Sequence, residues 1–394
     1  MDRLLRPYGV VIDGILELGI ELVLSDGVIQ GVRPHTGIPE LFVVSPAFVN
    51  AHSHLEYRGL QGKLRSTEYW RWIREITEAK REQNLDDVQT DCMRAADENA
   101  ICGVAAIAEH SDRPYAGEAL GTAGLPGVIF QEVITRFEPE SRAERLANAR
   151  DRSARQKFDA NVYSVRTEGY LAPHAYQTVD EETLRWFGSS GLPFSMHVAE
   201  SDLENQLTLS GTGAIGDTFR ELGVGYQATG KRLIPSLDEL GLVTAMAQFV
   251  HCCAIDSEET GLLASRGVNV AHCPRSNANL GCPTAPVREM LDAGINVGLG
   301  LDSAASSGPI DVFDEMRCAL RVSLERGRPV TPKEVWNMAT GMGAESLRFA
   351  IGDLTDWRIR AGSAVPLIMI HIPDALTTDE VIERGRPELV EWAL

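Results

Sequence analysis

The chain has 394 residues, of which 44 % are hydrophobic, and a formal net charge of −19 from 37 basic and 56 acidic residues. This is the composition of a globular protein, and so acidic a surface repels phosphate backbones and anionic lipids, which argues against nucleic-acid and membrane partners. No apolar stretch approaches the ~18 residues of a membrane span and no signal-peptide core is found, so a cytoplasmic location is expected.

Short β-type runs make up the first 45 residues. The runs Gly9–Leu16, Ile20–Leu24 and Val28–Val32 are separated by glycine and Asp-Gly turns, a pattern typical of hairpins. Similar short runs return in residues 355–394. We therefore expect one small β-sandwich domain assembled from both ends of the chain, residues 1–45 and 355–394.

Between residues 46 and 354, apolar strand-like runs alternate with polar loops and amphipathic helices. The strand candidates are Val43–Asn50, Gly103–Ala108, Gly127–Val133, Gly169–Ala172, Pro193–Val198, Ala247–His251, Gly267–His272 and Asn296–Leu301. The helical candidates are a helix through Tyr69, Trp72 and Ile76, then Thr90–Asn99, Ser141–Lys157, Glu181–Gly188, Ser236–Met246, Glu258–Ser265 and Ala285–Ala293. Eight such units predict an α/β fold, a (β/α)8 TIM barrel, whose active site lies at the C-terminal ends of the strands.

The first of these strands leads into two histidines, His52 and His54, separated by one residue. Side chains two apart on a strand lie on the same face, so both imidazoles can reach one ion. The His-x-His pattern alone is common by chance. It indicates a metal site here because other strand ends carry His197, His251 and Asp302. All of these side chains are expected at the active-site end of the predicted barrel.

Three imidazoles and one carboxylate, from His52, His54, His197 and Asp302, form a donor set that suits a divalent metal ion. Zinc is the first choice, and Fe²⁺ is the alternative. A single strand histidine is more often a buried packing residue than a ligand. Four candidates at one end of one barrel are hard to explain by packing, so the sequence predicts a metal site.

Further residues near strand ends are candidates for the reaction itself. His251 is expected to orient a water molecule, and His174 either contacts substrate or is an ordinary loop histidine. Glu200 follows the fifth strand, where a positioned carboxyl group can carry protons; its alternative is an exposed carboxylate at a strand end. His110 and His272 also end strands and are expected to pack or to support the ligands.

Taken together, the segments at these positions resemble the amidohydrolase superfamily, in its branch of mononuclear aminohydrolases and chlorohydrolases. The matching segments, in the order of the family, are Pro46–His54, Leu171–His174, His197–Ser201, Val250–Cys252, His272–Asn277 and Gly298–Ser303. The resemblance covers essentially the whole chain. It implies the metal ligands His52, His54, His197 and Asp302, the proton shuttle Glu200, and His251 beside the hydrolytic water.

The resemblance also implies a single metal ion. Binuclear members carry a bridging carboxylated lysine at the end of the fourth strand, and residues 163–179 of this chain contain no lysine. The implied reaction is hydrolytic. The ion lowers the pKa of a bound water toward ~7, Asp302 takes the proton of that water, and the resulting hydroxide attacks a C–NH2 carbon.

The expected substrate is an amino-substituted, purine-like heterocycle of the aminofutalosine or adenosine type. The segment His52–Glu56, followed by a helix with Trp70 and Trp72, resembles the aminofutalosine deaminases, although both tryptophans are also compatible with helix packing. Glu56 and His174 are the candidate substrate contacts. The alternatives are guanine, a triazine or chlorinated heterocycle, a ring amide such as imidazolone, and a binding protein that has lost catalysis. A homo-oligomer is compatible with the sequence.

Overall fold

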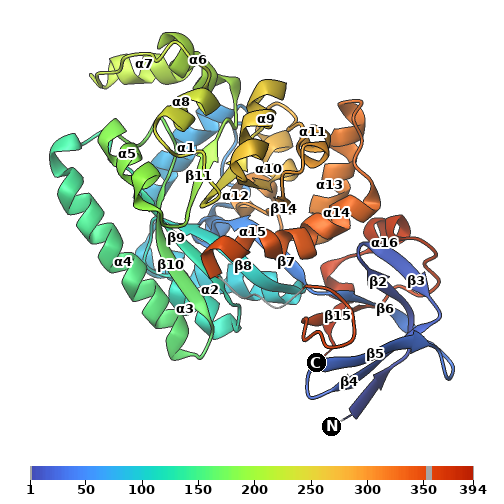
Figure 1. The fold of residues 1–394 in the computed structure, drawn as a ribbon. Coiled ribbons are helices and arrows are strands. Elements are labelled where there is room, and N and C mark those ends of the chain that lie inside the picture. The colour runs from blue at the N-terminus through green and yellow to red at the C-terminus, as the bar shows by residue number, and fades with distance from the viewer. Residues whose placement is uncertain (1, 352–356, 394) are drawn as a thin grey trace.

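The computed structural model describes residues 2–351 and 357–393 (Figure 1). Eight parallel strands lie at its centre, in two four-stranded sheets with the orders β10-β9-β8-β7 and β11-β12-β13-β14. Their bounds are Phe48–Ser53 (β7), Val104–Ser111 (β8), Gly127–Val133 (β9), Thr167–Pro173 (β10), Phe194–Val198 (β11), Ala247–His251 (β12), Asn269–His272 (β13) and Val297–Leu299 (β14). The expected α/β fold built on parallel strands is confirmed.

Single bridges join the two parallel sheets at both of their edges. Ser53 at the end of β7 pairs in parallel with Asp302 just after β14, and Ala175 just after β10 pairs in parallel with His197 in β11. The strands therefore follow one another in chain order around the centre of the molecule. Because neighbouring strands are parallel, their C-terminal ends collect at one end of the fold.

Helices connect the parallel strands, and α12 to α15 follow the last of them (Figure 1). Their bounds are Tyr69–Glu82 (α1), Leu85–Ile101 (α2), Ala116–Ala123 (α3), Arg142–Val162 (α4), Glu181–Ser190 (α5), Asp202–Ser210 (α6), Gly213–Glu221 (α7), Leu233–Glu239 (α8), Ser257–Arg266 (α9), Pro274–Asn279 (α10), Val287–Asp292 (α11), Ala304–Ser307 (α12), Val312–Glu325 (α13), Pro332–Ala339 (α14) and Gly341–Ile351 (α15). Asp256 before α9 and Thr331 before α14 start their helices with capping boxes. None of the described helices is both long and apolar enough to cross a membrane.

Strands from both ends of the chain form a smaller region at the lower right of Figure 1. One sheet has the order β16-β15-β6-β2-β3 and the other the order β1-β4-β5. The elements are Asp2–Leu5 (β1), Pro7–Ile12 (β2), Ile15–Leu18 (β3), Ile20–Ser25 (β4), Val28–Pro34 (β5), Glu40–Pro46 (β6), Leu367–Ile370 (β15), Thr378–Arg384 (α16) and Val390–Trp392 (β16). Trp336 donates to Ser45 Oγ at 3.0 Å and Trp357 to the carbonyl of Ala47 at 2.7 Å, which anchors this region beside β7.

Some predicted elements differ from the structure. The expected strand Val43–Asn50 is two strands, β6 in the small region and β7 in the parallel sheet, and they divide at Pro46, which cannot donate a ladder hydrogen bond. The expected helix Ser236–Met246 is wrong in its bounds, because α8 ends at a turn around Gly241, whose φ is +78°. Helices α6 and α7 had no counterpart in the predicted elements. The predicted boundary at 354/355 lies outside the described residues.

Candidate metal centre and active site

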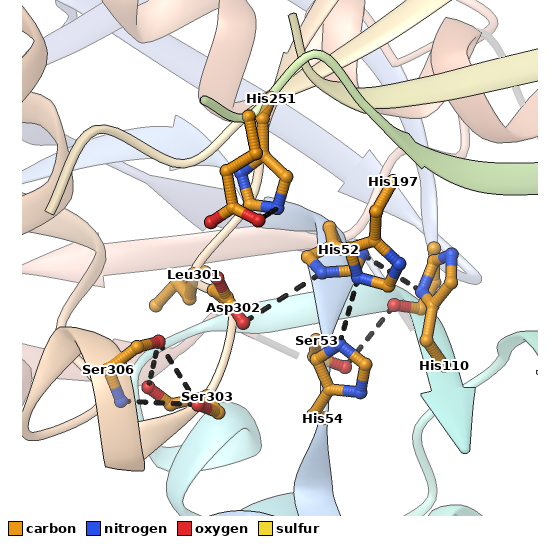
Figure 2. A network of polar contacts seen from close by, with 12 residues as sticks. His52, Ser53, His54, His110, His197, His251, Leu301, Asp302, Ser303 and Ser306 are labelled. Carbon is orange, nitrogen blue, oxygen red and sulfur yellow. Dashed lines mark hydrogen bonds and ion pairs between the residues drawn. The ribbon is translucent and has the colours of Figure 1, made fainter. Parts of the chain in front are cut away.

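Three imidazoles meet at the C-terminal ends of β7 and β11 (Figure 2). His52 lies in β7, His54 directly follows that strand, and His197 lies in β11. Nε2 of His54 and Nε2 of His197 are 3.2 Å apart, and the three side chains offer nitrogens within 4.8 Å of one another. The fold therefore brings together the three residues that the sequence predicts as nitrogen ligands.

Asp302 joins this cluster from the loop after the last parallel strand. Its Oδ1 is 3.9 Å from Nε2 of His52, and its backbone N–H donates to the carbonyl of His52 at 2.9 Å. Gly300 permits this close approach, because a Cβ at that position would lie 2.8 Å from the Cβ of His52. Asp302 has a φ of +54°, a conformation that non-glycine residues rarely adopt.

The protonation states of these side chains suit a metal ion. Burial, reinforced by the neighbouring imidazoles, holds the pKa of His52 and of His54 well below the ordinary value. Burial also lowers the pKa of His197 to about 4. All three imidazoles are therefore neutral at physiological pH, which is the form that binds metals.

The hydrogen bonds of these histidines leave nitrogen lone pairs available. Nδ1 of His197 donates to the carbonyl of His174 at 2.9 Å, so Nε2 of His197 carries a lone pair. Nε2 of His52 is buried and has no hydrogen-bond partner among the described residues. Three neutral imidazoles and one carboxylate are a donor set that zinc and Fe²⁺ both accept.

Buried side chains on β7 and β8 support the two strand-end histidines. Nδ1 of His52 lies 3.0 Å from Nδ1 of His110. The carboxylate of Glu109 accepts hydrogen bonds from Ser53 Oγ and from the N–H of Leu55 at 3.0 Å, which fixes the chain on both sides of His54. Such supporting groups orient metal ligands. Glu109 is missing from the sequence prediction; its position next to His110 at a strand end was the available signal.

Asn50 ties the first parallel strand to the loop that carries Asp302. Its Oδ1 accepts from the N–H of Leu301 at 3.0 Å, and its Nδ2 donates to Oδ1 of Asn99 at 3.0 Å. The side chain is 1 % exposed. The sequence prediction did not single out Asn50, because the partner Leu301 is close only in the folded chain.

Glu200 and His251 form a second pair beside the cluster. Oε2 of Glu200 is 3.6 Å from Nε2 of His251. Nδ2 of Asn277 donates to Nδ1 of His251 at 3.0 Å, and burial holds the pKa of His251 well below its ordinary value. The proton of this neutral ring is therefore on Nε2, on the side of Glu200. Burial and the charge of Asp302 raise the pKa of Glu200 well above its ordinary value, as suits a group that gives and takes protons.

The backbone is strained where these side chains leave their strands. Ala199, His251 and Cys252 have φ angles of +49°, +75° and +49°. Non-glycine residues adopt such angles where the surrounding structure imposes them, often at functional sites. The N–H of Cys252 donates to the carbonyl of Val198 at 3.0 Å, which helps to hold the strained turn.

A capping box holds the turn that carries Glu200. The carboxylate of Glu204 accepts from the N–H of Ala199 at 3.2 Å and from the N–H of Ser201 at 3.1 Å, at the start of α6. Burial raises the pKa of Glu204 to about 7. The Ser-x-x-Glu spacing of residues 201–204 is the sequence signal for this motif.

Helix α1 contacts Glu200 and, through Trp70, helix α7. Tyr69, the first residue of α1, is buried beside Glu200, and its hydroxyl opposes the rise in the pKa of that carboxyl group. Nε1 of Trp70 donates to Thr218 Oγ1 in α7 at 3.1 Å, which links these two helices. Trp72 is buried in an apolar cluster together with Tyr69. In this structure, both tryptophans of the segment therefore pack against protein.

His174 lies on the loop after β10, beside the ligand cluster. Its ring centroid is 4.9 Å from that of His197, and its Nδ1 lies 2.9 Å from Thr178 Oγ1. Burial lowers its pKa to about 4, so the ring is neutral. With Nδ1 engaged by Thr178, Nε2 is the nitrogen that remains for another partner.

Glu56 is fully buried in the short 3-10 helix Leu55–Leu60 that follows His54. Its carboxylate accepts from Ser111 Oγ at 2.6 Å and from the N–H of Arg113 at 3.1 Å. These bonds tie the segment after β7 to the segment after β8. A direct contact between Glu56 and a substrate would require this network to open, so the substrate role of Glu56 stays a prediction.

Comparisons with known proteins place the chain in a family. A family model described as the amidohydrolase family matches residues 43–356. A 5-methylthioadenosine/S-adenosylhomocysteine deaminase of Natronomonas pharaonis is 31 % identical over 339 residues, covering 84 % of this chain and 73 % of that protein. The protein of the same name from Pyrococcus furiosus is 26 % identical, covering 89 % of this chain and 83 % of that protein.

Solved structures agree with this assignment at the level of the fold. A zinc-bound adenosine deaminase from Xanthomonas campestris superposes with a TM-score of 0.80 at 22 % identity, covering 98 % of this chain and 90 % of that chain. A guanine deaminase from C. acetobutylicum with bound guanine gives a TM-score of 0.77 at 17 % identity, covering 99 % and 97 %. The chain belongs to the amidohydrolase family, which confirms the resemblance and makes the protein an enzyme of C–N bond hydrolysis.

Proposed function

We propose that the protein is a metal-dependent hydrolase that removes the amino group of an adenosine-type compound. The observation that carries this proposal is the pair of Glu200 and His251, a buried carboxyl group and a neutral imidazole whose facing atoms are 3.6 Å apart. The pair stands beside the candidate metal ligands. Relatives named as 5-methylthioadenosine/S-adenosylhomocysteine deaminases, one of them 31 % identical over 84 % of the chain, support an adenosine-type substrate.

The proposed ligands of one divalent cation are His52, His54, His197 and Asp302. Zinc is the first choice for this set of three imidazoles and a carboxylate, and Fe²⁺ is the alternative. When bound, such a cation lowers the pKa of a coordinated water toward ~7 and so supplies a nucleophile at neutral pH.

The side chains around this position can move the protons that deamination requires. Asp302 accepts the proton of the attacking water, and Nε2–H of His251 holds the oxygen of that water by a hydrogen bond. Glu200 protonates the ring nitrogen beside the attacked carbon, takes up the proton of the newly added hydroxyl group and passes it to the amino group, which leaves as ammonia while the carbonyl forms. The proton held by Asp302 then returns to Glu200, which restores both groups. Proton transfer by a positioned side chain contributes roughly 10²–10⁴-fold in rate.

His174 and Glu56 are the proposed residues on the substrate side. His174 is half-buried, its Nδ1 is engaged by Thr178, and its ring lies beside that of His197 with the planes inclined at 45°, so Nε2 can meet a ligand. Glu56 would act on the substrate through the loop that it holds together, or directly once its bonds to Ser111 and Arg113 open.

The test is ammonia release by the zinc-loaded protein from a panel of compounds. The panel contains adenosine, 5′-methylthioadenosine, S-adenosylhomocysteine, aminofutalosine and guanine, together with a chlorinated triazine and an imidazolone. We expect ammonia from one or more adenosine-type compounds. Hydrolysis of the triazine or the imidazolone with no ammonia from any adenosine-type compound would overturn the proposal. Turnover of no compound would favour a binding protein.

The same proposal includes the domain organisation. We propose that residues 46–354 form one closed (β/α)8 barrel and that residues 1–45 and 355–394 form a β-sandwich beside it. The bridges Ser53–Asp302 and Ala175–His197 support closure of the barrel, and the sheet that contains both β2 and β15 supports a joint terminal domain.

A further inference from the structure

The carboxyl group of Glu132 is buried beside the candidate metal ligands, and the proposed reaction gives it no role. Glu132 lies near the C-terminal end of β9 and is 4 % exposed, and its Oε1 has no hydrogen-bond partner among the described residues. Buried polar atoms are rarely left unpaired in native proteins, so an unpaired carboxylate oxygen beside a catalytic cluster points to a ligand. Burial raises the pKa of this group to about 7.

Glu132 does not serve to orient the proposed ligand His197, because no hydrogen bond joins the two side chains. Oε1 of Glu132 lies 3.8 Å from Nδ1 of His197, which is beyond hydrogen-bond distance. The N–H at this Nδ1 already donates to the carbonyl of His174 at 2.9 Å. Lys80 is not the hydrogen-bond partner of Glu132 either, because its Nζ bonds Tyr57 and Asp112.

Glu132 and Glu200 stand on opposite sides of His197. The strand order runs from β9, with Glu132, through β10 and its following loop, with His174, to β11, with His197. Glu200 follows β11 and faces His251 in the next strand, β12. A substrate base with one edge at Glu200 therefore presents another edge to Glu132 and His174. A carboxylate oxygen of Glu132 and a ring nitrogen of His174 lie within 4.8 Å of each other.

We propose that Glu132 accepts a hydrogen bond from the exocyclic amino group of the substrate, from the side of that group opposite to Glu200. This inference rests on the proposed function and names the residue that selects an amino group at the attacked carbon. Glu132 lies next to a proposed metal ligand, so it faces the reacting end of the base. A sugar, attached at the far end, would lie beyond its reach.

The chemistry of an amino group matches this position. An amino group has two N–H donors, and an acceptor for one of them makes the nitrogen more basic and stabilises the charge that it gains when Glu200 protonates it. Glu132 itself forms and breaks no covalent bond. A chlorine or methoxy group at the same carbon offers no donor, so the carboxylate gains nothing from these substituents.

The test compares two variants on two leaving groups. Glu132→Met removes the acceptor at similar side-chain length, whereas Glu132→Gln keeps an acceptor oxygen. Each zinc-loaded variant is assayed with the aminopurine nucleoside that the parent deaminates best and with its analogue that carries chlorine in place of the amino group. Turnover gives kcat/KM, and the chloro analogue is also measured as a competitive inhibitor. Glu168→Met, at a carboxylate that pairs with Lys157 on the outer side of β10, is the matched control.

We expect Glu132→Met to lower kcat/KM for the amino substrate by roughly 10- to 100-fold, the range for a hydrogen bond to a charged group. The variant should leave the chloro analogue, the zinc content and the melting temperature unchanged, and Glu132→Gln should keep most of the activity. Equal losses with both leaving groups would assign Glu132 a structural role, and no loss would exclude the contact. If the parent releases no ammonia from any aminopurine, the proposed function fails first and this inference fails with it.

Discussion

The phenol ring of Tyr57 stacks on the imidazole of His54, with ring centroids 5.1 Å apart and planes inclined at 25°. Nζ of Lys80, in α1, lies 4.7 Å from the centroid of the same phenol ring and hydrogen-bonds its hydroxyl. A proposed metal ligand therefore packs against a side chain that is held by the mostly buried cation of Lys80. The position of α1 is coupled in this way to the orientation of His54.

We expect Lys80→Met to lower the free energy of unfolding by about 3 kcal/mol, as measured by urea denaturation. Lys80 Nζ and Asp112 Oδ2 are 2.6 Å apart, and the two side chains are only 17 % and 24 % exposed. Removing the cation leaves a mostly buried carboxylate whose remaining cationic partner is Arg113, with Nε 3.4 Å from Oδ1 of Asp112. The matched control is Lys157→Met, at a more exposed pair with Glu168, which should change the free energy by at most about 1 kcal/mol. Similar small effects of both substitutions would contradict the prediction.

Glu200→Gln should lower kcat by roughly 10²–10⁴-fold, because glutamine keeps the volume of the side chain but cannot carry the proton. Metal analysis should give one ion per chain in both the parent and the variant, since Glu200 is outside the proposed ligand set. Glu239→Gln, at a surface carboxylate paired with Lys231, should keep the activity of the parent. A Glu200→Gln enzyme with most of its activity would remove this residue from the mechanism.

Asn50→Ala should weaken metal binding by roughly 10- to 100-fold, the usual effect of losing a group that supports metal ligands. The amide of Asn50 bonds the N–H of Leu301, next to Asp302, and the side chain of Asn99. Competition with a fluorescent chelator measures the affinity. Asn269→Ala is the control, because Asn269 bonds Asn296 at the start of β13, away from the ligands. Equal metal affinities of parent and Asn50→Ala would show that Leu301 needs no such support.

Glu21 should make the stability of the small terminal region depend on pH. Hydrogen bonds from the N–H and hydroxyl of Thr36 and from Arg33 and Arg6 outweigh the opposing effect of burial and lower the pKa of Glu21 from 4.5 to about 2. Because the folded-state pKa is lowered, this stabilisation is complete above the unfolded-state value and is lost as the pH falls from 4.5 toward 2.

The corresponding experiment compares unfolding of the parent and of Glu21→Gln across this pH range. The difference in unfolding free energy between the two proteins should be largest near neutral pH and should shrink progressively below pH 4.5. A difference that is the same at every pH would mean that the charge of Glu21 contributes nothing to the folded state.

The proposed metal ligands could be predicted from the sequence because strand geometry fixes the direction of alternate side chains. His52 and His54 share a face by their spacing alone, and His197 ends another strand of the same parallel set. The eight strands were likewise visible as short apolar runs between helices. These features depend on local sequence, and a parallel arrangement then brings the strand ends together.

Contacts between distant segments could not be predicted in this way. Tyr69 reaches Glu200 only because α1 folds back over the strand ends, and no pattern in the sequence specifies that direction. The carboxylate of Glu56 was expected to face a substrate, yet in the structure it bonds Ser111, a residue from the next strand. The sequence assigned no role to Glu132, because its position beside His174 and His197 exists only in the folded chain.

The bridge between Ser53 and Asp302 has a consequence for how the molecule unfolds. It joins the first parallel strand to the residues after the last one, so almost the whole parallel region lies between them in the chain. An ion held by both His52 and Asp302 would act as a non-covalent cross-link across this closure and would stabilise only the state in which it is intact. Strands β7 and β14 should then exchange their amide protons together, through opening of the whole ring of strands rather than by fraying of either edge.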